Sequence, residues 1–287
     1  YEAYDGFVTA IAVVCYTVQL YMDFSGTMDL VIGTAQIFGV KLPENFQRPF
    51  FSHTISEFWK RWHITLGTWF KDYIFYPLSM SKPLKKLTSH ARKHLGNHFG
   101  PLISGSIALF CVWVCNGLWH GAGWHYLFFG MYHFVLILCG SLFEPLVIKV
   151  TGILHIRRDS TAYRGMQIVR TGLLVCVGEL FFRAEGLRAG LIMFQKMFTD
   201  FSLAAFDDRS LFTIGMDKYD FLIVFLVMVL IFLISLQQEK GIVLRESIAA
   251  RPLAIRFAVY YALILLIVIF GAYGAGYVPV DPIYAGF

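Results

Sequence analysis

The chain has 287 residues, of which 57% are hydrophobic, 17% aromatic and 15% charged. Soluble domains average about 25% charged residues, and a soluble protein of this length could not bury so much apolar surface in one or two cores. The 28 phenylalanines exclude a disordered chain. The composition therefore predicts an integral membrane protein.

The formal net charge of +5 is concentrated in one stretch. Residues 41–100 contain ten Lys and Arg against three acids, a balance of +7, whereas the rest of the chain has a balance of −2. In a membrane protein this excess indicates a cytoplasmic face or contact with anionic headgroups. The stretch matches no DNA- or RNA-binding module, so we expect no nucleic-acid partner.

The chain begins with Tyr1, with no initiator Met and no charged segment before the first apolar run, so we expect no signal peptide and we expect that an N-terminal part of the protein is missing. Six apolar runs predict membrane helices, and several are shorter than the roughly 20 residues that cross a bilayer squarely. They cover residues 7–22, 102–115, 124–143, 165–182, 221–236 and 257–273. We therefore predict an all-α polytopic membrane helix bundle with short, tilted or re-entrant helices, in one domain over residues 1–287.

Residues 54–73 predict a basic amphipathic helix that lies in the plane of the membrane interface. Thr54 and Glu57 have the spacing of a capping box. At 100° per residue the apolar side chains from Ile55 onwards share one face, and the charged side chains lie opposite. Pro77 then ends the helix. His63 falls at the border of the apolar stripe.

The segment 82–98 carries five Lys and Arg and no acid. Within it His90, His94 and His98 recur every four residues, along one side of a helix if the segment is helical. Such spacing suits a metal site, but no carboxylate accompanies the histidines. A basic segment that faces lipid headgroups is the favoured interpretation.

The segment 113–133 reads WVCNGLWHGAGWHYLFFGMYH and places His120 among three glycines after a largely apolar run. Irregular backbone at membrane depth survives where protein buries it or water reaches it, and an ionisable residue there indicates a functional site. The alternative is a neutral histidine that is hydrogen-bonded between helices, with Asn116 one turn earlier. His125 and His133 are weaker candidates, because each suits an interfacial or helix-packing role.

The segment from Asn116 to Ala122 resembles the histidine signature of the membrane-bound O-acyltransferase (MBOAT) family. Other segments match its bacterial branch in order and spacing: residues 21–26, 39–46, 57–63, 69–73, 76–78, 181–184 and 270–276. Alginate O-acetylases are the most similar members, and teichoic-acid D-alanyl transfer proteins come next. The acetylases commonly continue with Gly-Gly-Asn-Arg where this chain has Ser79-Met-Ser-Lys82, which leaves the polymer open.

The resemblance implies transfer of an acyl group to a hydroxyl, with His120 as the catalytic histidine and His63 as a second functional histidine. Supporting or substrate-binding positions are Asn116, Trp119, Trp62, Asp72 and Asp23. We expect no bound cofactor and no metal, and an acyl donor such as acetyl-CoA or an acyl carrier as co-substrate. Expected partners are the lipid bilayer and a soluble or membrane-anchored partner acyltransferase or carrier protein. The expected location is the bacterial cytoplasmic membrane, with several passes.

Three other interpretations remain open. D-alanyl transfer to teichoic acid is the nearest one. A transporter or channel would use Asp23, Asn116 and His120 to line a pathway, although charged residues within the spans are few. A membrane-embedded metal enzyme would use His120, His125 and His133, although no carboxylates lie near them in the sequence.

Overall fold

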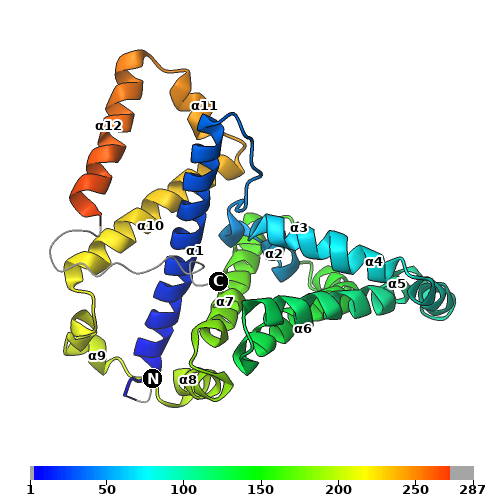
Figure 1. Cartoon of the computed structure of the whole chain (residues 1–287). Coiled ribbons are helices and arrows are strands. Elements are labelled where there is room, and N and C mark those ends of the chain that lie inside the picture. Colours follow the sequence, from blue (N-terminus) through cyan, green and yellow to red (C-terminus); the bar gives the residue numbers. More distant parts are fainter. Residues whose placement is uncertain (1–2, 272–287) are drawn as a thin grey trace. The chain divides into compact units, whose positions relative to one another are not determined.

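A computed structural model describes residues 3–271 (Figure 1). This part of the chain is helical and contains no strand. It forms two compact units, Tyr1–Ser202 and Leu203–Phe287. Six of the described helices are long and apolar enough to cross a membrane: α1 (Gly6–Ile37), α5 (Lys82–His120), α6 (Trp124–Ile153), α7 (Thr161–Arg183), α10 (Lys218–Glu239) and α12 (Leu253–Phe270). The predicted class of multi-pass, all-α membrane protein is confirmed.

The spanning helices extend well beyond the apolar runs that predicted them. The run 7–22 begins a helix of 32 residues, and the run 165–182 lies within a helix of 23 residues. Side-chain caps stabilise the polar starts of these helices. In α1, the Asp5 carboxylate accepts the N–H of Val8 at 2.9 Å. The last run, 257–273, lies in α12 as far as Phe270, and its final two residues are outside the described part of the chain.

In the first unit α1 packs against α7 and α8 (Leu187–Thr199). The contact is apolar, with Val13 of α1 buried against Leu180 and Phe181 of α7. The first N–H of α1 donates to the carbonyl of Asp200 at 2.8 Å, which ties the start of α1 to the end of α8. This three-helix packing fixes the face of α7 on which part of the site is built.

Gly96 divides α5 into two arms that run antiparallel. Its φ of 77° and ψ of −173° lie outside the helical region. Across the two arms, the hydroxyls of Thr88 and Ser104 are hydrogen-bonded. A Cβ on Gly100 would lie 2.5 Å from the Cα of Arg92, so the two backbones touch there. The long α5 is therefore a helical hairpin whose second arm leads to His120.

This reversal corrects the prediction for the three basic-segment histidines. His90 and His94 lie on the first arm, with ring centroids 4.7 Å apart. His98 begins the second arm and its Nε2 lies 3.0 Å from the carbonyl oxygen of Ser141 in α6. The prediction that all three follow one side of a helix is wrong, because the chain turns back between the second and the third.

The second arm of α5 crosses α6 at close range. A Cβ on Gly130 would lie 2.4 Å from the carbonyl oxygen of Trp113, and a Cβ on Gly117 would lie 2.7 Å from that of Tyr126. Contacts this short are possible only without side chains, so the two glycines let the backbones meet. The crossing holds the end of α5 firmly against the start of α6.

The predicted interfacial helix is present but broken. The chain forms α2 (Ile55–Arg61), α3 (Ile64–Phe70), the π-helical turn η2 (Lys71–Phe75) and α4 (Tyr76–Ser79). The prediction of one continuous helix over residues 54–73 is wrong, because the backbone leaves the helical region at His63.

The break also changes which side chains are buried. Phe58 and Phe70 are buried as the periodicity predicts, but Trp69 and Tyr73 are 50% and 68% exposed. Pro77 does not end a helix, since it lies in the first turn of α4, which continues directly from the π-helical turn η2. The segment from α2 to α4 lies along α5 and α6 (Figure 1).

The second unit contains α9 (Ala204–Asp207), η3 (Ser210–Thr213), α10, α11 (Leu244–Ala249) and α12. A capping box between Asp217 and Asp220 starts α10. The apolar side chains of α10 and α12 are mostly exposed, as expected of helices that face lipid.

Candidate functional site

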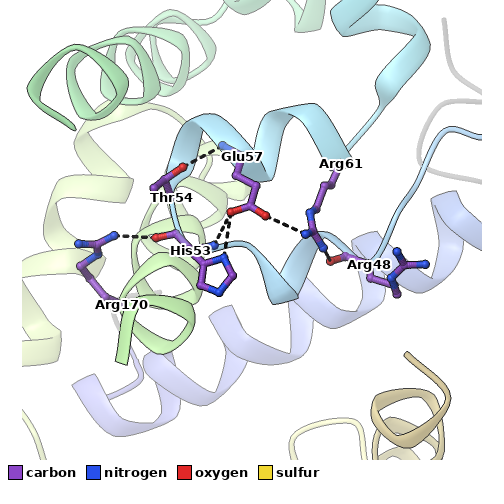
Figure 2. Close-up of polar contacts among 6 residues, drawn as sticks. All are labelled: Arg48, His53, Thr54, Glu57, Arg61 and Arg170. Atoms are coloured by element: carbon purple, nitrogen blue, oxygen red, sulfur yellow. Dashed lines mark hydrogen bonds and ion pairs between the residues drawn. The ribbon is translucent and has the colours of Figure 1, made fainter. Parts of the chain in front are cut away.

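A polar network fastens the start of α2 to α7 (Figure 2). The Thr54 hydroxyl accepts the N–H of Glu57 at 3.1 Å, as the capping-box spacing predicts. The Glu57 carboxylate accepts the N–H of His53 at 2.8 Å and a guanidinium N–H of Arg61 at 2.7 Å. Arg170 of α7 donates to the carbonyl of His53 at 2.8 Å. The loop that precedes α2 is thereby held in place by α7.

His63 lies at the break between α2 and α3, with a left-handed backbone (φ 46°, ψ 54°) that few non-glycine residues adopt. Asn45, from the loop before α2, organises this turn. Its carbonyl accepts the N–H of Ile64 at 3.0 Å, and its Oδ1 accepts the N–H and the hydroxyl of Thr65 at 3.1 and 2.7 Å. His63 Nδ1 lies 3.3 Å from the same Oδ1. These bonds replace the helical hydrogen bonds that a continuous helix would have made.

His120 is the last residue of α5. Gly121 ends the helix with φ 145° and ψ 171°, a conformation essentially restricted to glycine. The His120 side chain is buried, and its ring meets Phe182 of α7 edge-on at 4.8 Å and Phe129 of α6 at 5.9 Å. Three helices thus enclose the imidazole.

Trp119 brings the two predicted histidines together. Its ring centroid lies 6.0 Å from that of His63 and 4.6 Å from that of His120. Phe24 of α1 meets the His63 ring edge-on at 4.7 Å. Two histidines from distant segments therefore share one aromatic site.

Burial lowers the pKa of His63 from 6.5 to about 4. At neutral pH the imidazole is uncharged and carries one N–H and one lone pair. An uncharged imidazole can take a proton from a hydroxyl, and the aromatic surroundings strengthen any charge interaction that forms. The site is therefore suited to proton transfer.

Among the supporting positions, Asn116 lies close to His120 in α5, and Asp23 lies on α1. Asn116 is one turn before His120 and is buried, and its Oδ1 has no hydrogen-bond partner within the described residues. Asp23 is half-buried on α1, directly before Phe24.

Trp62 and Asp72 have different surroundings. Trp62 is buried and stacks on Phe58 at 5.4 Å, with further ring contacts to Tyr21 and Phe46. Its contacts support the turn that carries His63. Asp72 is exposed in η2.

Sequence reasoning missed Asn45 and Phe182 as site residues. Both lie in segments that resemble the family, 39–46 and 181–184, so a signal was present in each. The role of each depends on a long-range contact, which no local pattern encodes.

The other histidines of the signature segment pack separately. His133 is fully buried, stacks on Trp113 at 5.5 Å and has its Nδ1 3.0 Å from the carbonyl of Phe129. His125 packs on Tyr126 at 4.0 Å. No group of three or more His, Cys, Asp or Glu residues could hold a metal ion in the part of the chain that the structure describes.

Fold and site together define a multi-pass helical membrane protein with a buried histidine, His120, beside a half-buried one, His63. Residues 4–92 match the sequence model of the MBOAT, membrane-bound O-acyltransferase family, a match that includes His63 and ends before His120. The chain is 33% identical over 184 residues to the probable alginate O-acetylase AlgI of Pseudomonas aeruginosa, which covers 64% of this chain and 30% of that protein.

Two further relatives have different substrates in their names. Identity is 35% over 129 residues to the teichoic acid D-alanyltransferase of Bacillus subtilis, 45% of this chain and 30% of that protein. It is 37% over 118 residues to the peptidoglycan O-acetyltransferase of Helicobacter pylori, 41% of this chain and 19% of that protein. The predicted resemblance to membrane-bound O-acyltransferases is confirmed. The chain spans about a third of the length of the alginate O-acetylases it matches.

Proposed function

We propose that this protein is a membrane-bound O-acyltransferase that moves an acyl group, most simply acetyl, to hydroxyls of a cell-surface polysaccharide or to a partner that passes it on. The observation that carries this proposal is the meeting of His63 and His120 at Trp119. All three relatives described above are named as acetyl- or alanyl-transferring enzymes, which favours an enzyme over a transporter.

In this mechanism His120, in its uncharged form, takes the proton of the acceptor hydroxyl. The hydroxyl oxygen attacks the carbonyl carbon of the donor thioester or ester, a new C–O bond forms, and the donor's C–S or C–O bond breaks. The proton held by His120 passes to the leaving thiolate or alkoxide. Proton transfer of this kind typically contributes about 10²–10⁴-fold to the rate.

The donor, partner and location follow from the same proposal. We assign acetyl-CoA or an acyl carrier as co-substrate, with no bound cofactor, and a soluble or membrane-anchored acyltransferase or carrier protein as partner. The bacterial cytoplasmic membrane is the location that suits a donor made in the cytoplasm and a basic segment at residues 82–98. D-alanyl transfer is the second candidate, supported by the B. subtilis relative.

Deletion of the gene, followed by mass spectrometry of each purified cell-surface polymer, tests the function. We expect one polymer to lose its acyl groups, with a mass difference that distinguishes acetyl from alanyl. Wild-type protein should restore them and His120→Ala should not, although both reach the membrane in equal amounts. His94→Ala is the matched control, because it makes the same change on the exposed first arm of α5. Normal acylation by His120→Ala would refute the assignment.

A further inference from the structure

The side chain of Asn45 is buried although it lies in a loop that connects two helices. Its Oδ1 is the common point of three polar contacts: the N–H of Thr65, the hydroxyl of Thr65 and the Nδ1 of His63. A buried amide with this many contacts to one short turn is a specific structural device. Its consequence for the imidazole follows from which atom donates in each contact.

The backbone N–H of Thr65 settles the orientation of the Asn45 amide. A backbone N–H can only donate, so the amide atom 3.1 Å from it must be the oxygen and not the NH₂ group. That oxygen can only accept. His63 Nδ1, 3.3 Å away, must therefore carry a proton to donate to it. In a neutral imidazole with a proton on Nδ1, Nε2 holds a lone pair.

We infer that Asn45 is a positioning residue for the proposed acyl transfer, because it fixes His63 as the tautomer with a proton on Nδ1 and a lone pair on Nε2. The inference rests on the proposed function for its catalytic meaning. It gives His63 a definite role: Nε2 accepts a hydrogen bond from a substrate hydroxyl other than the one whose proton His120 takes. It cannot donate a hydrogen bond to an oxyanion while the ring is neutral.

The contacts of His63 with its neighbours fix the orientation of its ring. Phe24 meets the ring edge-on and Trp119 lies at 6.0 Å, so the imidazole is held from two sides. The third contact is with Asn45, and of the two ring nitrogens it involves Nδ1.

The test uses ¹⁵N NMR of the histidine-labelled protein in detergent or lipid, with His63 identified by the signals lost in His63→Gln. Wild-type protein at pH 7 should show one tautomer, with Nδ1 protonated and Nε2 unprotonated. Asn45→Leu, which keeps the branching of the side chain at a larger volume but lacks an acceptor, should give a mixture of tautomers and lower kcat about 10–100-fold. Asn45→Asp keeps an acceptor oxygen and should restore the single tautomer.

Thr65→Val is the matched control, because it removes a donor to the same Oδ1 without touching the imidazole. It should leave the tautomer unchanged. A mixture of tautomers in active wild-type protein would overturn this inference and leave the proposed function intact. The tautomer is read from the wild-type protein, and His63→Gln serves only to identify the His63 signals. A single tautomer in wild-type protein that transfers no acyl group would confirm the assignment of the protons and overturn the proposed function, and with it the catalytic role of Asn45.

Discussion

His63 combines two unfavourable features that a purely structural residue would avoid. Its left-handed backbone costs about 1–2 kcal/mol at a non-glycine residue. Its polar ring is also half-buried among aromatic side chains. The hydrogen bonds to Asn45, worth about 1 kcal/mol each, offset part of this cost. Strain of this kind at a non-glycine residue is typical of functional sites, since glycine would adopt the same turn without the steric cost.

The lowered pKa of His63 makes stability depend on pH in one direction. The unfolded imidazole titrates near 6.5 and the folded one at about 4, so between these values the unfolded state binds the proton first. His63 should therefore lower the free energy of unfolding by about 2.5 kcal/mol as the pH drops from 6.5 to 4, and its contribution should be constant above 7. Thermal unfolding of detergent-solubilised protein measures this. His63→Gln should lose this contribution, so the difference between the two pH profiles measures it, and equal pH profiles for both proteins would contradict the assignment.

At this scale the sequence predicted His63 and His120 but not the contacts that orient them. His120 stood out because three glycines surround an ionisable residue in an apolar run. Asn45 gave no such sign, since its role depends on a loop that folds back to a turn eighteen residues later. The periodicity predicted that His63 lies at the border of the apolar stripe of one helix, whereas in the structure it lies between two helices.

At the scale of elements, apolar periodicity predicted where the helices lie and failed where single residues turn the chain. Gly96 lies in a segment with helical composition on both sides, and only its backbone angles reveal the reversal. The break at His63 depends on hydrogen bonds from Asn45, which lies outside the periodic segment. Tertiary contacts override local pattern at both positions, and both overrides shape the site.

The crossing of α5 and α6 should be sensitive to one methyl group. In Gly130→Ala the new Cβ would lie 2.4 Å from the Trp113 carbonyl, so the helices must separate. We expect a loss of about 1–3 kcal/mol in stability and a larger fall in acyl transfer, because the His120 end of α5 moves. Gly140→Ala, also on α6, has nothing within 4 Å of its Cβ and is the matched control. Thermal unfolding and the transfer assay measure both, and equal behaviour of the two variants would contradict the close crossing.

At the scale of the whole molecule, the distribution of charge and the positions of the helix ends indicate how the first unit is oriented in the membrane. The hairpin tip at Gly96 and the loop after α6 lie at one end of the first unit, since Arg158 of this loop donates to Glu144 of α6 at 2.7 Å. His98, two residues beyond the tip, contacts Ser141 on the same stretch of α6. Both places are basic, and a basic excess near membrane helices marks the cytoplasmic side.

Cysteine labelling should therefore find the hairpin tip and the loop after α6 on the same side of the membrane. In protein without its native cysteines, Asn97→Cys and Asp159→Cys place exposed thiols at these two points. An impermeant maleimide should label both only after the cytoplasmic membrane is permeabilised, because the basic residues at both places keep them on the cytoplasmic face. Ala108→Cys, at a fully buried position of α5, should stay unlabelled in both conditions and shows that labelling reports exposure. If the two thiols label from opposite sides, the common face is wrong. If both label in intact cells, the orientation is inverted, and a cytoplasmic acyl donor would have to enter from the end of the unit away from the basic segment.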